Sequence, residues 1–251
     1  MILPEGMQLP RGLRVMVFAP HPDDESLGAG GLLQLIAASR GTSRVVFVTS
    51  GDGFVEGARR YFGRPLLVPD DFIDYGRLRC REALDAMKSL GIGRVGIDFL
   101  GFPDTGIEAL WSAHRTEHPY VSPHTCMDHP PYPDCLNREC RYTGSSLNRM
   151  ISDVITGFSP HWVVLPDPLD RHPDHRGTAL FVLHSLSRLA GSGMLQVENM
   201  RVLTYLIHSP SQPPVLPGTA TAASGDGGSA GAVDTPLLAS VPLSFSLDEK
   251  E

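Results

Sequence analysis

The chain of 251 residues is long enough for one sizeable core, and its 41% hydrophobic and 20% charged content is ordinary for a globular protein. A net charge of −7 without a basic cluster argues against nucleic-acid binding, and no apolar run approaches the roughly 20 residues of a membrane span. The first residues lack a signal-peptide pattern and the cysteines number only four, so we expect a cytoplasmic protein with reduced thiols.

Short runs rich in β-branched residues alternate with helical patterns along the chain. The predicted strands are Val15–Ala19, Val45–Thr49, Val95–Leu100, Trp162–Pro166 and Val202–Ile207. The predicted helices cover 26–41 and 76–91, which end at Gly41 and Gly91 as C-caps, then Gly144–Phe158 and about Arg176–Leu189. This alternation predicts an α/β fold with a mostly parallel sheet, helices on both faces, and a ligand site at the carboxyl ends of the strands.

Two stretches lack this periodicity. Residues 103–143 carry six prolines, three cysteines and four histidines, and they are too long for an ordinary connection. A run rich in Gly, Ser and Ala at about 217–233 is typical of a flexible loop. We therefore expect one domain over residues 1–251, interrupted by an irregular Cys/His-rich insert and by this loop.

Two unusual turns follow predicted strands. The stretch F-A-P-H-P-D-D-E-S closes the first strand and places His21 just before Asp23 and Asp24. After the fourth predicted strand, the stretch P-D-P-L-D-R-H-P-D-H places His172 and His175 before a helix. In a parallel sheet both turns open onto the same edge, so we expect them to form one site.

Imidazoles and carboxylates in this combination are typical of a catalytic zinc site, where three protein ligands leave one position for water. Two histidines and one aspartate would bind the ion, and the remaining aspartate would act as a base for the water. A further histidine could stabilise the oxyanion or protonate the leaving group. Each aspartate could instead cap the following helix, as Asp174 could in the second turn. The residues alone do not decide which aspartate of the first turn is the ligand.

The glycines of S-L-G-A-G-G, after the first turn, invite comparison with dinucleotide-binding loops. Gly28 and Gly30 match the first half of G-x-G-x-x-G, but Leu33 occupies the sixth place. The glycines also follow the acidic turn, where a pyrophosphate would meet carboxylates. Close packing of the helix on a strand explains them better.

The order of these motifs resembles the LmbE/PIG-L family of zinc-dependent N-deacetylases. The resemblance rests on H-P-D-D-E, the following G-A-G-G and the later H-P-D-H, supported by R-x-x-E at Arg79 and Glu82 and by L-G-F-P-D at Leu100–Asp104. It extends from Val15 to about His208. It implies a Rossmann-like domain that removes the acetyl group from N-acetylated amino sugars, typically of the N-acetylglucosamine type.

The resemblance also implies roles for individual residues. It assigns His21, Asp24 and His175 to the zinc. It makes Asp23 the general base and His172 the residue that stabilises the oxyanion. Ferrous iron or cobalt could occupy the same ligands, since metal choice depends on availability as well as geometry.

Three further residues border this set. In relatives the position of Arg79 often reaches the substrate, although an i,i+3 pair with Glu82 on an exposed helix would also account for it. Asp104 could line the substrate pocket or only begin the P-D-T-G turn. Glu25 is expected to hydrogen-bond a metal-binding histidine rather than to bind the metal itself.

The Cys/His-rich insert suggests a second, structural zinc near Cys126, Cys135 and Cys140. Their spacing does not match the usual C-x₂₋₄-C pairs, so free thiols and a disulfide stay open as alternatives. The insert lies where most relatives border the substrate pocket. The chain also ends at D-E-K-E, where relatives usually continue into a further helix.

The function expected from these observations is metal-dependent removal of an acetyl group from a small N-acetylated molecule. The alternatives are cleavage of another amide, such as a thiol conjugate or a longer acyl chain, and noncatalytic metal or carbohydrate binding. A two-metal phosphoesterase is disfavoured, because the ligands suffice for only one metal ion and the sequence has no cluster of Lys and Arg residues that could bind a phosphate. The expected partner is the small-molecule substrate, without nucleic acid or a membrane span, and a homo-oligomer stays open.

Overall fold

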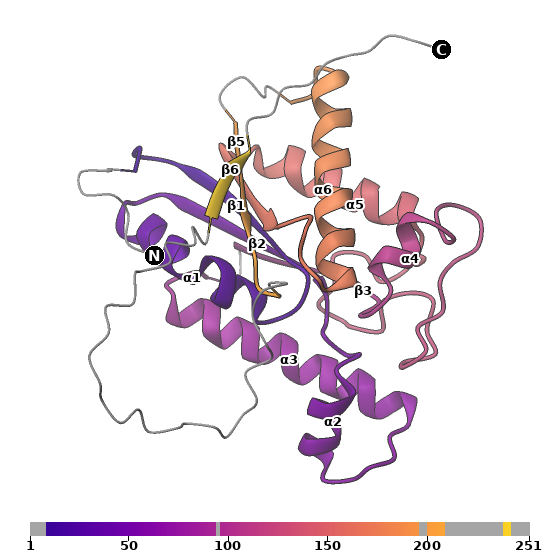
Figure 1. The fold of residues 1–251 in the computed structure, drawn as a ribbon. Helices are drawn as coiled ribbons and strands as arrows, with labels where there is room; N and C mark the ends of the chain where they lie inside the picture. Colours follow the sequence, from indigo (N-terminus) through magenta and orange to yellow (C-terminus); the bar gives the residue numbers. More distant parts are fainter. Residues whose placement is uncertain (1–8, 94–95, 196–199, 209–237, 242–251) are drawn as a thin grey trace, which may run out of the picture.

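A computed structural model describes residues 9–93, 96–195, 200–208 and 238–241. Within this part of the chain, a six-stranded sheet in the order β3-β2-β1-β4-β5-β6 lies at the centre (Figure 1). The strands are β1 (Arg14–Ala19), β2 (Thr42–Thr49), β3 (Ile97–Phe102), β4 (Trp162–Pro166), β5 (Arg201–Tyr205) and β6 (Leu238–Val241). The first five are parallel and β6 runs antiparallel to β5, so the sheet is mostly parallel as predicted.

Helices cover both faces of the sheet. They are α1 (Asp24–Ala38), α2 (Val55–Phe62), α3 (Pro69–Ser89), α4 (Ile107–Trp111), α5 (Gly144–Phe158) and α6 (Pro173–Gly191). Helices α1 and α3 share one hydrophobic core with the sheet, and α4, α5 and α6 share the other. The short helix α2 packs against the start of α3 in a third, smaller cluster (Figure 1).

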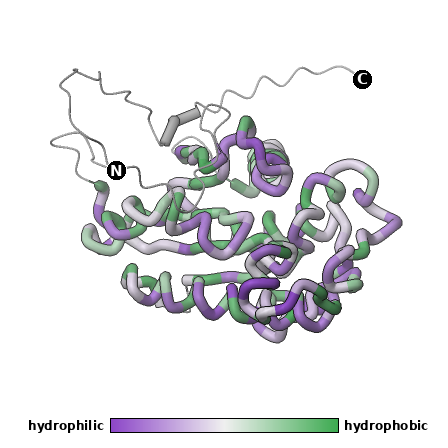
Figure 2. Tube along the Cα trace, turned by 60° about the horizontal axis from the view of Figure 1, so that its bottom comes forward, coloured by the Kyte–Doolittle hydropathy of each residue, from purple (hydrophilic) through white to green (hydrophobic). Residues whose placement is uncertain are grey.

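Strand β1 is buried on both faces because its side chains alternate between the two cores. Val15, Val17 and Ala19 belong to the core with α1 and α3, whereas Met16 and Phe18 belong to the core with α5 and α6. A strand buried in this way is a continuous apolar run in sequence, which is the pattern that predicted it. The covering helices alternate between hydrophobic and hydrophilic residues along their length (Figure 2).

The predicted α/β fold class is confirmed, and several elements match closely. The predictions Gly144–Phe158 and Trp162–Pro166 coincide with α5 and β4. Helix α3 begins at Pro69, well before its predicted start, and the strand predicted over Val202–Ile207 ends at Tyr205. The short elements α2, α4 and β6 had no counterpart in the prediction.

The predicted C-cap at Gly41 is wrong by two positions. The C-cap of α1 is Ser39, and the left-handed conformation falls on Arg40, with φ 57°. Gly41 donates its N–H to Ile36 O at 3.0 Å, as the last residue of a Schellman turn. A Cβ at Gly41 would lie 2.8 Å from the carbonyl oxygen of Leu13, so close approach of the chain, rather than φ, requires glycine here.

Gly28 allows α1 to lie directly on β5. A Cβ at Gly28 would lie 2.6 Å from Cγ of Tyr205. The Tyr205 hydroxyl in turn donates a hydrogen bond to Phe18 O at 2.9 Å, across the sheet. Gly28 therefore serves close packing of helix on strand, as predicted, whereas a Cβ at Gly30 would come no closer than 4.0 Å to another atom.

Tyrosines anchor the Cys/His-rich insert to the sheet. Tyr142 donates its hydroxyl to Gly101 O at 2.9 Å, and Tyr132 donates to the buried Asp52 carboxylate. The flexible loop expected at about 217–233 lies outside the described residues. No helix in the described part of the chain is long and apolar enough to cross a membrane.

Candidate active site

The two histidine turns meet at the carboxyl ends of neighbouring strands. Strand β1 ends at Ala19, just before His21, and β4 leads into α6, whose N-cap is His172. The ring centroids of His21 and His172 lie 4.7 Å apart, and those of His21 and His175 lie 5.3 Å apart. The predicted convergence is confirmed. It falls where the strand order reverses around β1 and β4, the usual ligand position in such sheets.

These side chains line an open cleft of about 360 Å³, a volume typical of small-molecule sites. The predicted site residues in its lining are His21, Asp23, Asp24, Arg79, Asp104 and His172. The remaining predicted ligand, His175, has a fully buried side chain in contact with Asp24.

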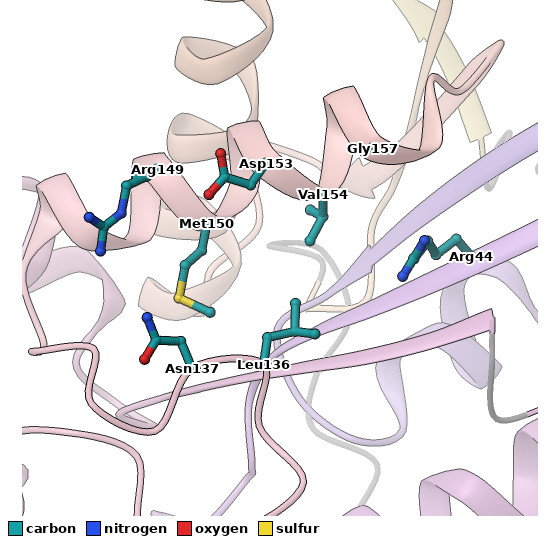
Figure 3. Close-up of a pocket in the computed structure, with 8 residues that line it drawn as sticks. All are labelled: Arg44, Leu136, Asn137, Arg149, Met150, Asp153, Val154 and Gly157. Carbon is teal, nitrogen blue, oxygen red and sulfur yellow. The ribbon is translucent and has the colours of Figure 1, made fainter.

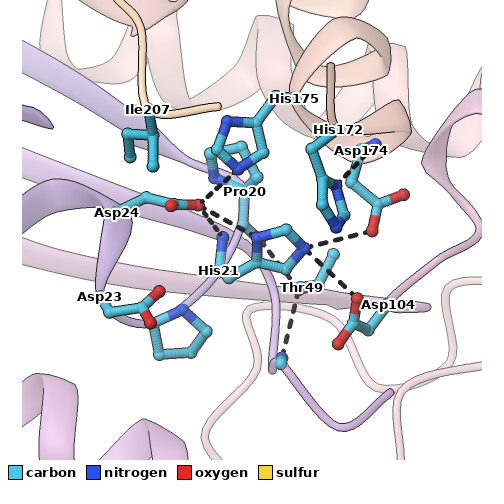
Figure 4. Close-up of polar contacts among 12 residues, drawn as sticks. Pro20, His21, Asp23, Asp24, Thr49, Asp104, His172, Asp174, His175 and Ile207 are labelled. Carbon is cyan, nitrogen blue, oxygen red and sulfur yellow. Dashed lines mark hydrogen bonds and ion pairs between the residues drawn. The ribbon is translucent and has the colours of Figure 1, made fainter. Parts of the chain in front are cut away.

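Asp24 is the point where the predicted ligands meet (Figure 4). Its Oδ2 lies 3.1 Å from His21 Nδ1 and 3.1 Å from His175 Nε2, and it accepts the His21 backbone N–H at 2.9 Å. Burial acts to raise the pKa of Asp24, but the close contacts with His175 and His21 outweigh it and hold the pKa well below its usual range. The carboxylate is therefore ionised at neutral pH.

Asp170 fixes the orientation of His175. Its Oδ2 lies 3.1 Å from Nδ1 of His175, and its Oδ1 lies 3.1 Å from Nδ1 of His208. Burial acts to raise the pKa of Asp170, yet hydrogen bonds, first those from His175 and His208, keep the pKa far below its usual range. The ionised carboxylate keeps the proton of a neutral His175 ring on Nδ1. Nε2 is thereby left free to bind a metal.

His21 is held in the same way by two other carboxyl groups. Its Nε2 lies 3.2 Å from Asp174 Oδ2 and 3.3 Å from Asp104 Oδ1. Asp174 is fully buried and also accepts the N–H groups of Thr105 and Ile107, at 2.7 and 3.0 Å. These partners keep the proton of a neutral His21 ring on Nε2, so Nδ1 is free as a ligand.

This donor set fits a divalent metal ion. Around a tetrahedral zinc with bonds of about 2.0–2.1 Å, ligand atoms are about 3.3 Å apart. The two 3.1 Å spacings at Asp24 are close to this value. His175 Nε2 is buried and, despite lying near Asp24, makes no aligned hydrogen bond to any described residue. Burial opposes a charge on His21, but Asp104 raises its pKa well above the usual value, so the surroundings favour a positive charge here.

His172 lies beside these ligands, but its ring is engaged differently. Donor atoms of His21, His172 and His175 lie within 4.8 Å of one another, so distance alone would allow His172 to bind a metal. However, Nδ1 of His172 accepts the backbone N–H of Asp174 at 3.2 Å and so caps α6. Burial, followed by the neighbouring histidines, lowers the pKa of His172 to about 4. The neutral ring then carries its proton on Nε2, which can donate a hydrogen bond but cannot bind a metal.

Asp23 is the exposed carboxylate of the site. Its side chain is 54% exposed, and its Oδ2 lies 2.9 Å from Nη2 of Arg79. Arg79 itself is largely buried and also donates to Pro22 O at 2.9 Å. The alternative of an exposed local pair between Arg79 and Glu82 is therefore wrong.

The proposal that the aspartates only cap helices is not supported. The Asp23 side chain precedes α1 but makes no capping hydrogen bond to any described residue. Asp174 does not cap α6, because His172 takes that position. Glu25, expected to support a histidine, instead accepts a hydrogen bond from Ser26 Oγ at 2.6 Å, and burial raises the pKa of Glu25 to about 7. The carboxyl groups described above fill the supporting role.

The three cysteines of the insert do not gather into a metal site. Cys126 is exposed, Cys135 and Cys140 are buried, and all three are free thiols. In the described part of the chain, the donor clusters that could hold a metal consist of histidines and aspartates. Burial also raises the pKa of the Cys135 thiol, which disfavours the thiolate that zinc requires. The structure therefore gives the predicted second zinc no ligand set.

Sequence reasoning missed Asp170 and His208 and gave Asp174 only a capping role. Asp170 stands two positions before His172, and His208 follows the last predicted strand. Their position after strand ends was a usable signal, since the ligand edge of a parallel sheet collects such residues. Spacing could not reveal which rings their side chains contact.

Comparison with known proteins finds a matching family and a curated relative. Residues 16–186 match the family described as PIG-L, GlcNAc-PI de-N-acetylase. A 1D-myo-inositol 2-acetamido-2-deoxy-alpha-D-glucopyranoside deacetylase of Corynebacterium efficiens is 29% identical over 167 residues, which cover 65% of this chain and 46% of that enzyme. The chain thus spans somewhat less than half the length of this relative.

Solved structures resemble the fold. A 4-carboxy-2-hydroxymuconate hydratase from Pseudomonas putida KT2440 has a TM-score of 0.52 at 17% identity, covering 79% of this chain and 67% of that chain. An N,N'-diacetylchitobiose deacetylase from Pyrococcus horikoshii has a TM-score of 0.46 at 17% identity, covering 76% of this chain and 59% of that chain. At such identities the likeness concerns the fold and not the reaction.

Proposed function

Because this chain belongs to the PIG-L family, described as GlcNAc-PI de-N-acetylase, we propose that it is a metal-dependent deacetylase of small N-acetylated amino sugars of the N-acetylglucosamine type. One observation carries the proposal. Asp24 Oδ2 lies 3.1 Å from a ring nitrogen of both His21 and His175, and the exposed Asp23 stands beside them in an open cleft. The fold alone would not decide the reaction, because a hydratase shares it.

In this proposal His21, Asp24 and His175 hold the metal, with zinc as the first choice and ferrous iron or cobalt as alternatives. When bound, the ion would polarise the amide carbonyl and make a nearby water more acidic. Asp24 contributes negative charge. The histidines contribute ring nitrogens that Asp170 and Asp174 keep free of a proton.

Asp23 is the proposed general base. Its carboxylate is exposed to the cleft, and the ion pair with Arg79 sets its orientation. Asp23 accepts a proton from the attacking water as the new C–O bond forms at the amide carbon. The carbonyl electron pair moves onto oxygen, and His172 donates its Nε2–H to the oxyanion. The C–N bond then breaks as protonated Asp23 passes its proton to the amine, which releases acetate and a free amine.

Arg79 and Asp104 are the proposed sugar-binding residues, because both line the same cleft. The orientation of the Asp104 carboxylate is fixed by a hydrogen bond, since its Oδ2 accepts the backbone N–H of Gly53 at 2.8 Å. Arg79 would divide its guanidinium N–H groups between Asp23 and a substrate hydroxyl. A substrate role for Arg79 predicts that Arg79→Lys raises KM as well as lowering kcat.

The function is tested by screening N-acetylated amino sugars for release of acetate and free amine by metal-loaded protein. The same screen should include amides with longer acyl chains and thiol conjugates, which tests the alternative amidase. Preferred release of acetate from an N-acetylated sugar supports the proposal. Absence of acetate release from every sugar, with metal bound, would refute it.

The residue roles are tested by two single substitutions at the first turn. Asp23→Ala should abolish acetate release but retain the metal, whereas Asp24→Ala should lose the metal. Asp153→Ala is a matched control, because Asp153 lines a separate cavity beside α5 (Figure 3). Metal loss from Asp23→Ala with retention in Asp24→Ala would reverse the assignment of base and ligand.

A further inference from the structure

Three apolar side chains line the catalytic cleft; two of them are exposed, and the third, Ile207, is partly buried against the core. Leu27, Phe54 and Ile207 share this cleft with His21 and Asp23. They come from separate elements, namely the first turns of α1, the residue before α2 and the segment after β5. Leu27 is 65% exposed and Phe54 is 52% exposed, so both leave much of their surface free for a ligand. We call these three residues the apolar collar.

The two exposed members of the collar are held in place by their helices. Leu27 follows Asp23 and Asp24 by about one helical turn, which puts it on the same face of α1 as these carboxylates. Phe54 packs closely on Gly57, where an added Cβ would lie 2.5 Å from Phe54 Cδ1. The glycine therefore lets the ring rest on α2 while the rest of its surface faces outward.

The collar differs in chemistry from the other side chains of the cleft. These are carboxyl groups, histidines, an arginine and a threonine, which suit the amide and hydroxyl groups of a sugar. The collar side chains offer carbon atoms only, and apolar surface exposed to water favours an apolar partner. A ligand that contacts both groups of side chains would therefore be polar at one end and apolar at the other.

We propose that the substrate carries an apolar group attached beside its N-acetylated amino sugar, and that Leu27, Phe54 and Ile207 bind this group. The inference rests on the proposed deacetylation, because the collar and the reacting groups line one cleft. The collar thus selects among N-acetylated sugars by what is attached to them.

The test compares methyl and octyl glycosides of N-acetylglucosamine, with the octyl compound kept below the concentration at which it forms micelles. We expect metal-loaded wild type to show a kcat/KM about tenfold higher for the octyl glycoside, mainly through a lower KM. Phe54→Ala and Leu27→Ala should each lower this octyl-to-methyl ratio, and the double variant should bring it close to one. Equal kcat/KM values for both glycosides in wild type would overturn the inference and leave the deacetylase proposal intact.

Leu136→Ala is the matched control for loss of an exposed apolar side chain. Leu136 is 51% exposed but lines the separate cavity beside α5 (Figure 3). This variant should keep the wild-type octyl-to-methyl ratio. A fall as large as that in Phe54→Ala would indicate a general surface effect and overturn the inference.

Calorimetric titration keeps the two proposals separable. Tighter binding of the octyl than of the methyl glycoside, lost in Phe54→Ala, would support the collar even if neither compound were hydrolysed, and the deacetylase proposal alone would then fail. Equal binding of both glycosides would overturn the collar. The collar could also bind a second copy of this chain, which sedimentation tests. A wild-type dimer that dissociates in Phe54→Ala, while the octyl-to-methyl ratio of kcat/KM stays the same in that variant, would assign the collar to this contact and overturn the inference.

Discussion

Asp170 offers the sharpest single perturbation of the site. Its Oδ1 accepts two hydrogen bonds, from the backbone N–H of His172 and from the ring of His208. Its Oδ2 accepts three, from the ring of His175 and from the backbone N–H groups of Ile207 and His208. Asp170→Asn keeps the shape but turns one oxygen into a donor, so at least two N–H groups lose their acceptor. Each unsatisfied buried donor costs about 1–3 kcal/mol, so a destabilisation of about 2–6 kcal/mol must be relieved.

The new amide side chain can face these donors in two ways. With its nitrogen at the Oδ1 position, the His172 backbone N–H and the exposed His208 ring lose their acceptor, and His175 keeps an acceptor that no longer carries a charge. With its nitrogen at the Oδ2 position, the His175 proton moves from Nδ1 to Nε2, and this tautomer cannot bind a metal through Nε2. Both arrangements weaken the support that makes His175 a good ligand. We therefore expect Asp170→Asn to fold but to bind zinc about 10- to 100-fold more weakly, the usual effect of losing such a partner.

The assay is competition for zinc between the metal-free protein and a chromogenic chelator, with circular dichroism to confirm that the variant is folded. Asp167→Asn is the matched control, because the Asp167 carboxylate accepts hydrogen bonds from Leu169 and Thr204 in the same segment. It should keep the wild-type zinc affinity. Folded Asp170→Asn protein that binds zinc as tightly as wild type would refute the supporting role of Asp170.

Two further predictions concern stability. Gly28→Ala should lower the free energy of unfolding by about 1–3 kcal/mol, because the new Cβ would crowd Tyr205. Gly30→Ala is the control and should not lower it, because the nearest atom to a Cβ there is 4.0 Å away. Equal losses for both variants in denaturant unfolding would contradict this reasoning. Burial raises the pKa of Asp52 to about 7, so the folded state holds a proton that the unfolded state releases, and stability falls as pH rises from about 4 to 7. Asp52→Asn should remove this contribution, at most roughly 4 kcal/mol. Urea unfolding at pH 5 and pH 8 measures it, and an unchanged difference between the two pH values would count against the buried proton.

The strands and turns that build the site could be predicted because their causes are local. A parallel strand buried on both faces must be an apolar run, and β1 and β4 are such runs. Each is followed by a turn with histidine, proline and aspartate, so position after a strand was enough to bring His21, His172 and His175 together. The family resemblance then separated Asp23 from Asp24, which spacing could not do.

The supporting role of Asp174 could not be predicted because its contacts are long-range, unlike those of Asp170 with His172 and His175. Asp174 accepts N–H groups of Thr105 and Ile107, 69 and 67 positions away, and lies next to His21, 153 positions away. No spacing rule relates such residues. Glu25 was the nearest acid by sequence, but its helix turns it into the interior, away from the rings.

The short helix α2 was not predicted from the sequence for a different reason. Helix α2 packs its apolar residues on α3 and not on the sheet, so it lacks the long periodic stripe of α5 or α6. The early start of α3 did carry a local signal: Pro69 occupies its first turn, and Asp71 Oδ2 accepts the N–H of Val68 at 2.8 Å. Start signals of this kind would have placed the helix correctly.

The proposed function requires one metal ion, held by His21, Asp24 and His175, for acetate release. The most direct measurement is acetate release from an N-acetylated amino sugar by metal-stripped protein as zinc is added, with bound metal quantified in the same samples. We expect no release from stripped protein, a rise that saturates at one zinc per chain, and loss of both binding and release in His175→Ala. Acetate release that survives stripping, or that persists in His175→Ala, would contradict this requirement for the metal.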